Sequence, residues 1–210
     1  MAALIRYGII AMPLLGLGSV VYVWMAASST PNAKTGIKSF AAGKMKSLQF
    51  DEKIRTQMPA SPIVDAAGKE LSLYDFDTEI IVLNLWYINC PPCVYEMPTL
   101  GDLQDRYPEE RLKVVTVSFD RPSEHLKAQE KLKQLAGGRL PFYGAPNGRL
   151  LQDTKMYGFP TTIIYRKSGC EVGRISGDAE WASPDAIKLF DALLANPNLR
   201  NDCKSADTAS

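Results

Sequence analysis

The run from Glu79 to Trp86 is almost wholly apolar, and three residues after it the chain reads Cys90-Pro91-Pro92-Cys93. A run of this length, rich in Ile, Val and Leu, predicts a central strand that is buried on both faces. Residues 94–107 predict a helix that is broken or bent at Pro98, because proline cannot donate a backbone hydrogen bond. Two cysteines therefore stand where a buried strand ends and a helix begins, which restricts the folds open to the chain.

Strands and helices alternate along the rest of the chain. The other predicted elements are a hairpin over 63–73, a strand over 112–119, a helix over 122–136, a short helix over 147–157, strands over 161–165 and 171–175, and a helix over 184–195. Leu126, Leu132 and Leu135 give the 122–136 helix its apolar spacing. This order predicts an α/β domain over 47–196, with a central mixed sheet flanked by helices, and a polar tail over 197–210.

The N-terminal region predicts a membrane anchor. Residues 7–27 carry no charge and form a run long enough to cross a bilayer as a helix. Arg6 precedes this run and the first acidic residue is Asp51, so the positive-inside rule leaves the N-terminus in the cytoplasm. We expect a single-pass anchor over 1–27 in the cytoplasmic (inner) membrane, a linker with a short helix over 28–46, and a catalytic domain in the periplasm. A signal peptide cleaved near Ala26-Ala27-Ser28 is the alternative, and it would also export the domain.

Composition excludes several classes of protein. The net charge is +1 and no cluster of Lys or Arg stands out, so nucleic acid is not an expected partner. Cys90 and Cys93 would need two more ligands to hold zinc. With one histidine in the chain, neither a metal nor another cofactor is expected.

The Cys-x-x-Cys pair predicts disulfide exchange. The positive end of a helix dipole stabilises a thiolate, so we expect a lowered pKa for the Cys90 thiol. Cys93, on the first helical turn, would resolve a mixed disulfide formed by Cys90. Glu96 follows one turn later and could exchange a proton with a thiol, although spacing alone equally allows a solvated helix residue.

Several segments carry a family resemblance. They are Val82–Trp86, Cys90–Cys93, Glu96–Pro98 and Gly158–Thr162, with Gly177–Ala186 as a further stretch. Together these segments resemble TlpA-like thiol:disulfide oxidoreductases of the thioredoxin superfamily, which are related to the ResA and CcmG proteins of cytochrome c maturation. The resemblance covers residues 36–195 and the N-terminal anchor, and it implies a thioredoxin fold.

The resemblance also implies roles for individual residues. Cys90 would be the exposed nucleophile and Cys93 the buried resolving thiol, with Glu96 as the active-site glutamate. Pro160 would be a cis-proline against the reactive pair, and an ordinary trans proline that starts a strand is the alternative. The groove around the pair would be supported by Trp86, Pro91, Pro92, Phe159 and Thr161.

Two positions depart from the pattern of the relatives. Asn89 stands where relatives commonly have tryptophan before the first cysteine. Asn84 stands where ordinary thioredoxin has a buried aspartate. Because an amide does not titrate, Glu96 becomes the better candidate for handling protons.

The function that follows is a membrane-anchored periplasmic disulfide reductase. The resemblance implies partner proteins with disulfides, among them cytochrome oxidase copper-site proteins, a copper chaperone or apocytochrome c, and a membrane electron donor for re-reduction. A copper metallochaperone that uses the Cys90 and Cys93 thiolates is one alternative. A disulfide oxidant or isomerase is another, although such proteins commonly carry a histidine between the cysteines. A peroxidase is disfavoured because the Thr-x-x-Cys pattern is absent.

Cys170 and Cys203 predict a structural disulfide. The last helix should run antiparallel to the last strand, and their lengths match, so Cys203 could reach Cys170. The alternative is two unpaired thiols, which would be unusual in an oxidising compartment.

Overall fold

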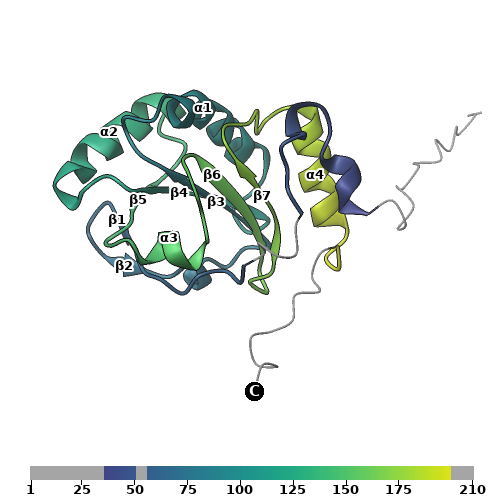
Figure 1. Cartoon of the computed structure of the whole chain (residues 1–210), viewed down its shortest axis with the longest axis horizontal. Coiled ribbons are helices and arrows are strands. Elements are labelled where there is room, and N and C mark those ends of the chain that lie inside the picture. Colours follow the sequence, from purple (N-terminus) through teal and green to yellow (C-terminus); the bar gives the residue numbers. More distant parts are fainter. Residues whose placement is uncertain (1–35, 51–55, 200–210) are drawn as a thin grey trace, which may run out of the picture. The chain divides into compact units, whose positions relative to one another are not determined.

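The computed structural model describes residues 36–50 and 56–199 (Figure 1). The chain divides into two units, Met1–Lys34 and Thr35–Ser210, and all described residues belong to the second. The predicted anchor over 1–27, the first part of the linker and most of the polar tail lie outside the described residues. No described helix has the length and apolar character needed to cross a lipid bilayer.

The described part of the chain forms a mixed sheet of seven strands in the order β2-β1-β5-β4-β3-β6-β7. The strands are β1 (Ile63–Asp65), β2 (Glu70–Leu71), β3 (Ile80–Trp86), β4 (Leu112–Ser118), β5 (Phe142–Gly144), β6 (Thr161–Arg166) and β7 (Glu171–Ser176). β4 is parallel to both β3 and β5, whereas β6 is antiparallel to both β3 and β7. Every residue of β3 is buried, which confirms the predicted central strand.

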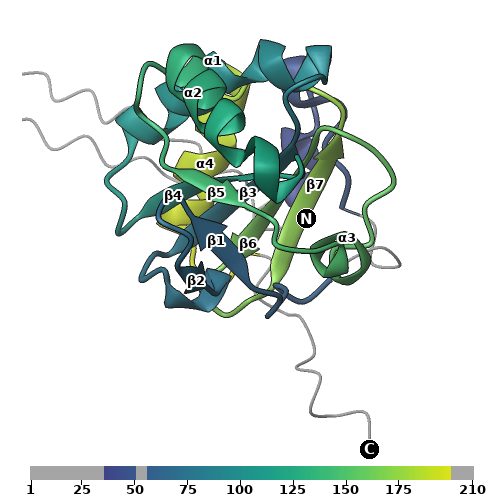
Figure 2. The same cartoon turned by 90° about the vertical axis from the view of Figure 1, so that its left-hand side faces the viewer.

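Helices cover both faces of the sheet (Figures 1 and 2). They are α1 (Pro91–Arg106), α2 (His125–Ala136), α3 (Arg149–Asp153) and α4 (Pro184–Ala195). Buried side chains of α1, α2 and α4 form one apolar cluster with one face of the sheet, and Leu150 of α3 belongs to a second cluster on the other face. α4 begins where predicted, because the Ser183 side chain accepts a hydrogen bond from the Ala186 N–H.

The linker helix and α1 differ from their predictions. The short helix expected within the linker over 28–46 is instead a pair of 3₁₀ turns, Ile37–Phe40 and Gly43–Met45. Gly43 has a φ of 53°, a left-handed conformation that interrupts a helix. α1 begins at Pro91, three residues earlier than expected, and it runs through Pro98 without a break, so of the two expectations for Pro98 only a bend stays a prediction.

The apolar side of α2 was predicted in part, because Leu132 is buried and Leu135 packs against the core whereas Leu126 does not. A 3₁₀ turn, Pro122–Glu124, precedes the helix, and Leu126 is 79% exposed. The residues that α2 buries are Ala128, Leu132 and Ala136, at intervals of four. Leu126 lies two residues before Ala128 and therefore points to nearly the opposite side of the helix.

The strand β5 was missed by the sequence analysis. It pairs with the ends of β4 and β1. Because it has only three residues, its sequence cannot show the alternation of apolar and polar residues that marks a strand. Its last residue, Gly144, leaves no space for a side chain, because a Cβ there would overlap the His125 ring. α3 is likewise shorter than the helix expected over 147–157.

Candidate redox site

The reactive pair lies at the junction of β3 and α1. Cys90 is the N-cap of α1, and its Sγ accepts a hydrogen bond from the Cys93 N–H at 3.3 Å. Pro91 and Pro92 occupy the first helical positions, where no backbone N–H is needed. Cys93 lies on the first helical turn, as predicted.

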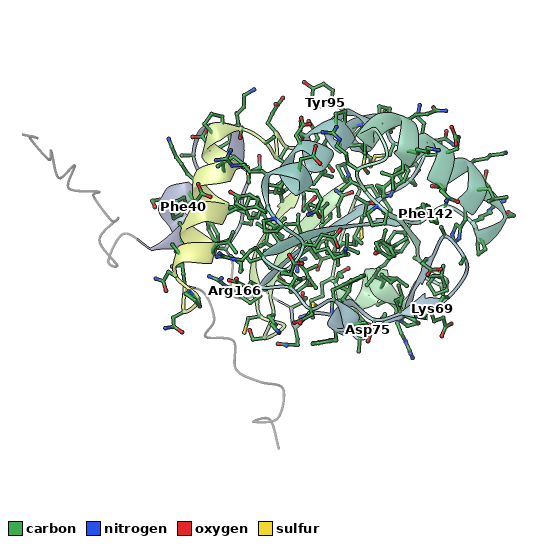
Figure 3. All side chains as sticks on the ribbon, turned by 180° about the vertical axis from the view of Figure 1, so that it is seen from behind. Phe40, Lys69, Asp75, Tyr95, Phe142 and Arg166 are labelled. Carbon is green, nitrogen blue, oxygen red and sulfur yellow. A yellow bond between two sulfur atoms is a disulfide. The ribbon has the colours of Figure 1, made fainter. Side chains whose placement is uncertain are left out.

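Cys90 and Cys93 form a disulfide with their Cα atoms 5.2 Å apart. Cys93 is fully buried and Cys90 is only 2% exposed. The expectation of an exposed Cys90 is therefore wrong for the oxidised protein. Its side chain turns back over the first helical turn and joins the apolar cluster that contains Trp86 and Met97. Tyr95, by contrast, is 65% exposed and points outward from α1 (Figure 3).

Glu96 is a buried carboxylate one helical turn beyond Cys93. Its Oε1 accepts a hydrogen bond from Asn84 Nδ2 of β3 at 2.7 Å. Its Oε2 accepts two more, from Trp181 Nε1 at 2.8 Å and from the Ala179 N–H at 3.2 Å. The reading of Glu96 as a solvated helix residue is therefore wrong.

Burial raises the pKa of Glu96 to about 7, although the hydrogen bonds from Trp181, Asn84 and Ala179 oppose that rise. Loss of hydration destabilises the charged form of a carboxyl group, whereas hydrogen bonds donated to its oxygens stabilise that form. A pKa near neutrality lets the group both accept and release a proton under ordinary conditions.

A row of polar side chains crosses the sheet beneath Glu96. Asn84 is in register with Thr116 of β4 and with Thr162 of β6. Asn84 Nδ2 also donates to Thr162 Oγ1 at 2.8 Å. Within the described residues, Asn84 Oδ1 and Thr116 Oγ1 are buried without a hydrogen-bond partner. Asn84 therefore holds Glu96 but supplies no second titrating group.

The predicted cis-proline is confirmed, because the Phe159–Pro160 peptide bond is cis. Thr161 is the first residue of β6 and is in register with Leu85 of β3. Pro160 therefore lies near the C-terminal end of β3, from which the chain continues to Cys90. The Phe159 ring contacts the rings of Tyr87 and Phe119, with centroids 5.2 Å and 5.4 Å away.

Trp86 is fully buried in the same apolar cluster as both cysteines, consistent with the support predicted for it. Trp181 is the residue that the sequence analysis missed. The stretch Gly177–Ala186 contributes to the family resemblance, but the resemblance implies no role for any residue in it. Trp181 lies 85 positions after Glu96, and no local pattern links the two.

Cys170 is buried directly before β7, and Cys203 lies outside the described residues. The Arg166 guanidinium donates hydrogen bonds to the carbonyl oxygens of Leu193 and Leu199, each at 2.8 Å. The Arg166 N–H donates to the Cys170 carbonyl oxygen at 2.9 Å. The chain after α4 thus returns toward Cys170, and the Cys170–Cys203 disulfide stays a prediction.

Comparisons with known proteins agree with this geometry. The sequence profile of the AhpC/TSA family matches residues 54–178. Thiol-disulfide oxidoreductase ResA of Bacillus thuringiensis subsp. konkukian is 26% identical over 125 residues, which cover 60% of this chain and 70% of that protein.

Two solved structures share the fold. One is the thioredoxin domain of a thiol-disulfide oxidoreductase from Bacteroides vulgatus, with a TM-score of 0.56, 19% identity, and coverage of 66% of this chain and 96% of that one. The other is a thiol:disulfide interchange protein from Bacteroides sp., with a TM-score of 0.54, 22% identity, and coverage of 68% and 90%. These likenesses show that the described domain has the thioredoxin fold.

Proposed function

This chain belongs to the AhpC/TSA family and is a thiol:disulfide oxidoreductase, and we propose that it acts as a reductant of disulfides in partner proteins. The observation that carries the proposal is the Cys90–Cys93 disulfide at the N-terminus of α1, with the buried carboxylate of Glu96 one turn away. The two intervening prolines support a reducing role, since oxidants and isomerases commonly place a histidine there.

The reaction begins from the dithiol form of the pair. The Cys90 thiolate, stabilised at the helix N-terminus, attacks one sulfur of the substrate disulfide and releases the other substrate sulfur as a thiolate. Cys93 then loses its proton and attacks Cys90 Sγ. This second step forms the Cys90–Cys93 disulfide and releases the second substrate thiolate. The substrate gains two electrons and the cysteine pair loses two.

Glu96 handles the proton of the second step. With a pKa of about 7, its carboxylate is present at neutral pH in a large enough fraction to accept the proton that Cys93 gives up. After the disulfide has formed, the same group can return a proton to a product thiolate.

We place this activity in the periplasm, on a domain tethered by residues 1–27. The uncharged run over 7–27, with Arg6 before it, supports that placement. The partners are then exported proteins whose paired cysteines must be reduced before metal or heme is loaded, such as copper-site proteins of cytochrome oxidase, a copper chaperone or apocytochrome c. A membrane protein that passes on electrons from the cytoplasm would re-reduce the pair.

The reduction potential of the Cys90–Cys93 pair tests the direction of electron flow. The full chain is equilibrated in glutathione or dithiothreitol buffers and the fraction of free thiol is measured. A value near or below about −270 mV, the potential of thioredoxin, is expected for a reductant. A value near about −120 mV, the range of strong oxidants, would overturn the proposal.

Trapping of the mixed disulfide identifies the partner. Cys93→Ser leaves the Cys90 thiol to attack but removes the thiol that resolves the intermediate. We expect this variant to accumulate a covalent complex with its substrate, and the Cys90→Ser control to accumulate none. Equal capture by both variants would show that Cys90 is not the nucleophile.

A further inference from the structure

We propose that Trp181 is a positioning residue, whose indole N–H holds the Glu96 carboxylate in place for proton exchange with the cysteine pair. The inference rests on the proposed role of Glu96 and adds to it a residue that lies outside every motif of the reactive pair. Trp181 follows β7, on a segment that the sequence separates from the cysteines by almost 90 residues.

Both the side chain and the backbone of Trp181 donate hydrogen bonds to one turn of α1. Its side chain donates from Nε1 to Glu96 Oε2 at 2.8 Å. Its backbone N–H donates to Thr99 Oγ1 at 3.2 Å, and the Thr99 hydroxyl donates to the Glu96 carbonyl oxygen at 2.8 Å. Because Trp181 and Glu96 are both fully buried, the hydrogen bond from Nε1 to Oε2 does not have to compete with solvent.

The chemistry of these contacts favours a carboxylate. The three groups that bind the Glu96 oxygens, Asn84 Nδ2, Trp181 Nε1 and the Ala179 N–H, are all donors, and none of them is a cation. Donors stabilise the anion, whereas burial destabilises it. The charge on Glu96 is therefore balanced by neutral dipoles, and the loss of one of them moves the balance toward the protonated form.

In the part of the chain that the structure describes, few other titratable groups face Glu96. Asp178 precedes Ala179, and its negative charge raises the pKa of Glu96. Cys93 lies one turn earlier on the same side of α1, and Cys90 is bonded to it. β3 and β6 contribute the neutral side chains of Asn84 and Thr162. In the oxidised protein the two cysteines do not titrate, so the Glu96 titration can be followed without them.

The first test is the titration of Glu96 in the oxidised full chain, purified in mild detergent and labelled with ¹³C at the glutamate carboxyl groups. The resonance that disappears in Glu96→Gln is assigned to Glu96. Trp181→Phe removes the indole donor, and we expect the apparent pKa of Glu96 to rise by about one unit, the size expected for one hydrogen bond to a charged group. An unchanged titration in Trp181→Phe would overturn the proposal.

Two further variants separate positioning from packing. The first variant carries benzothienylalanine in place of Trp181 and of no other tryptophan. This analogue keeps the shape of the indole but has sulfur in place of the N–H, so it should raise the pKa of Glu96 as Trp181→Phe does. Tyr107→Phe removes a different hydrogen bond between α1 and α4, from Tyr107 to Asp191, and should leave the Glu96 pKa unchanged. A shift with Tyr107→Phe equal to that with Trp181→Phe would count against a specific role.

The second test is a double-variant cycle in the reduced protein, read from the pH profile of Cys90 alkylation. Trp181→Phe should shift the profile when Glu96 is present and should add nothing in the Glu96→Gln background. An equal shift in both backgrounds would mean that Trp181 does not act through Glu96. The proposed direction of electron transfer would fail separately, in the reduction potential, on which neither result depends.

Discussion

Two buried glutamates of this domain differ in the partners of their carboxylate groups. Glu171, at the start of β7, pairs with Arg174, whose Nε and second terminal nitrogen lie 2.7 Å and 2.6 Å from its two oxygens. The Thr56 N–H and hydroxyl also donate to Glu171 Oε2. Glu96 is equally buried, but its bound partners are neutral donors. Among the described residues, Glu171 has a cation beside it and Glu96 has none.

The difference assigns a different task to each carboxylate. The buried Arg174 bonds both oxygens of Glu171, and that pair joins β7 to Thr56. Glu96 is left with a pKa of about 7 and so can change its charge near neutral pH. Glu96 lies one helical turn beyond Cys93, where exchange requires proton movement.

The largest effect is expected when the cation is removed from the paired site. Arg174→Met removes the buried cation that bonds both oxygens of Glu171, which should lower the free energy of unfolding by about 3–5 kcal/mol. Urea denaturation of the oxidised protein at pH 7.5 measures the loss. The double variant Glu171→Gln with Arg174→Met should recover much of it. A loss in Arg174→Met no larger than that of an exposed substitution would contradict the comparison.

The unpaired site should show its protonation as a pH-dependent stability. The pKa of Glu96 is about 7 in the folded protein, against an ordinary value of 4.5 for a glutamate in the unfolded chain. Between those pH values the folded protein keeps a proton that the unfolded chain has lost, so stability falls as the pH rises, by about 3 kcal/mol in total. Glu96→Gln should lack this fall. Denaturation of both oxidised proteins at pH 4.5 and 7.5 tests it, and a constant difference between them would refute the assigned pKa.

A second carboxyl group beside Glu96 should sharpen the contrast further. Asn84→Asp replaces the donor that lies 2.7 Å from Glu96 Oε1 with a competing acid. Two carboxyl groups at that distance share one proton, so the upper apparent pKa should rise by about 1–2 units above that of Glu96 alone. Carboxyl ¹³C titration measures the shift. Thr116→Val, in the same polar row, is the matched control and should shift nothing.

The smallest effect is expected at an exposed pair. Asp77 and Lys167 form a salt bridge at 2.5 Å, and both side chains are largely in solvent. Lys167 lowers the pKa of Asp77, but water and salt screen such contacts. Asp77→Asn should leave the denaturation midpoint unchanged within error at pH 7.5. A loss as large as that of Arg174→Met would show that burial is not what distinguishes these carboxylates.

Local signals predicted the framework of the site. The composition of β3, the cysteine spacing and the Ser183-Pro184 start of α4 are each contained in a few neighbouring residues, and each was found. Leu126 was misassigned because three leucines at helical spacing do not say which side of α2 meets the sheet. β5 was missed because three residues cannot show an alternation.

The environment of Glu96 depends on contacts between distant segments. The spacing predicts that Glu96 lies one turn after Cys93. Its hydrogen-bond partners cannot be predicted in this way, because Asn84 precedes Glu96 by 12 residues and Trp181 follows it by 85. The Glu171–Arg174 pair was also beyond sequence analysis. Residues three apart on a regular strand point to opposite faces, and here a register shift between β6 and β7 turns both side chains to one face.

The covered position of Cys90 has a consequence for how electrons are routed. A sulfur with 2% of its residue exposed reacts slowly with small dissolved thiols, because exchange needs access along the sulfur–sulfur axis. A protein partner that uncovers the Cys90 sulfur when it docks should react faster. We therefore expect the oxidised pair to be kinetically insulated, with an oxidation state that depends on which protein is bound and little on the surrounding pool of small thiols.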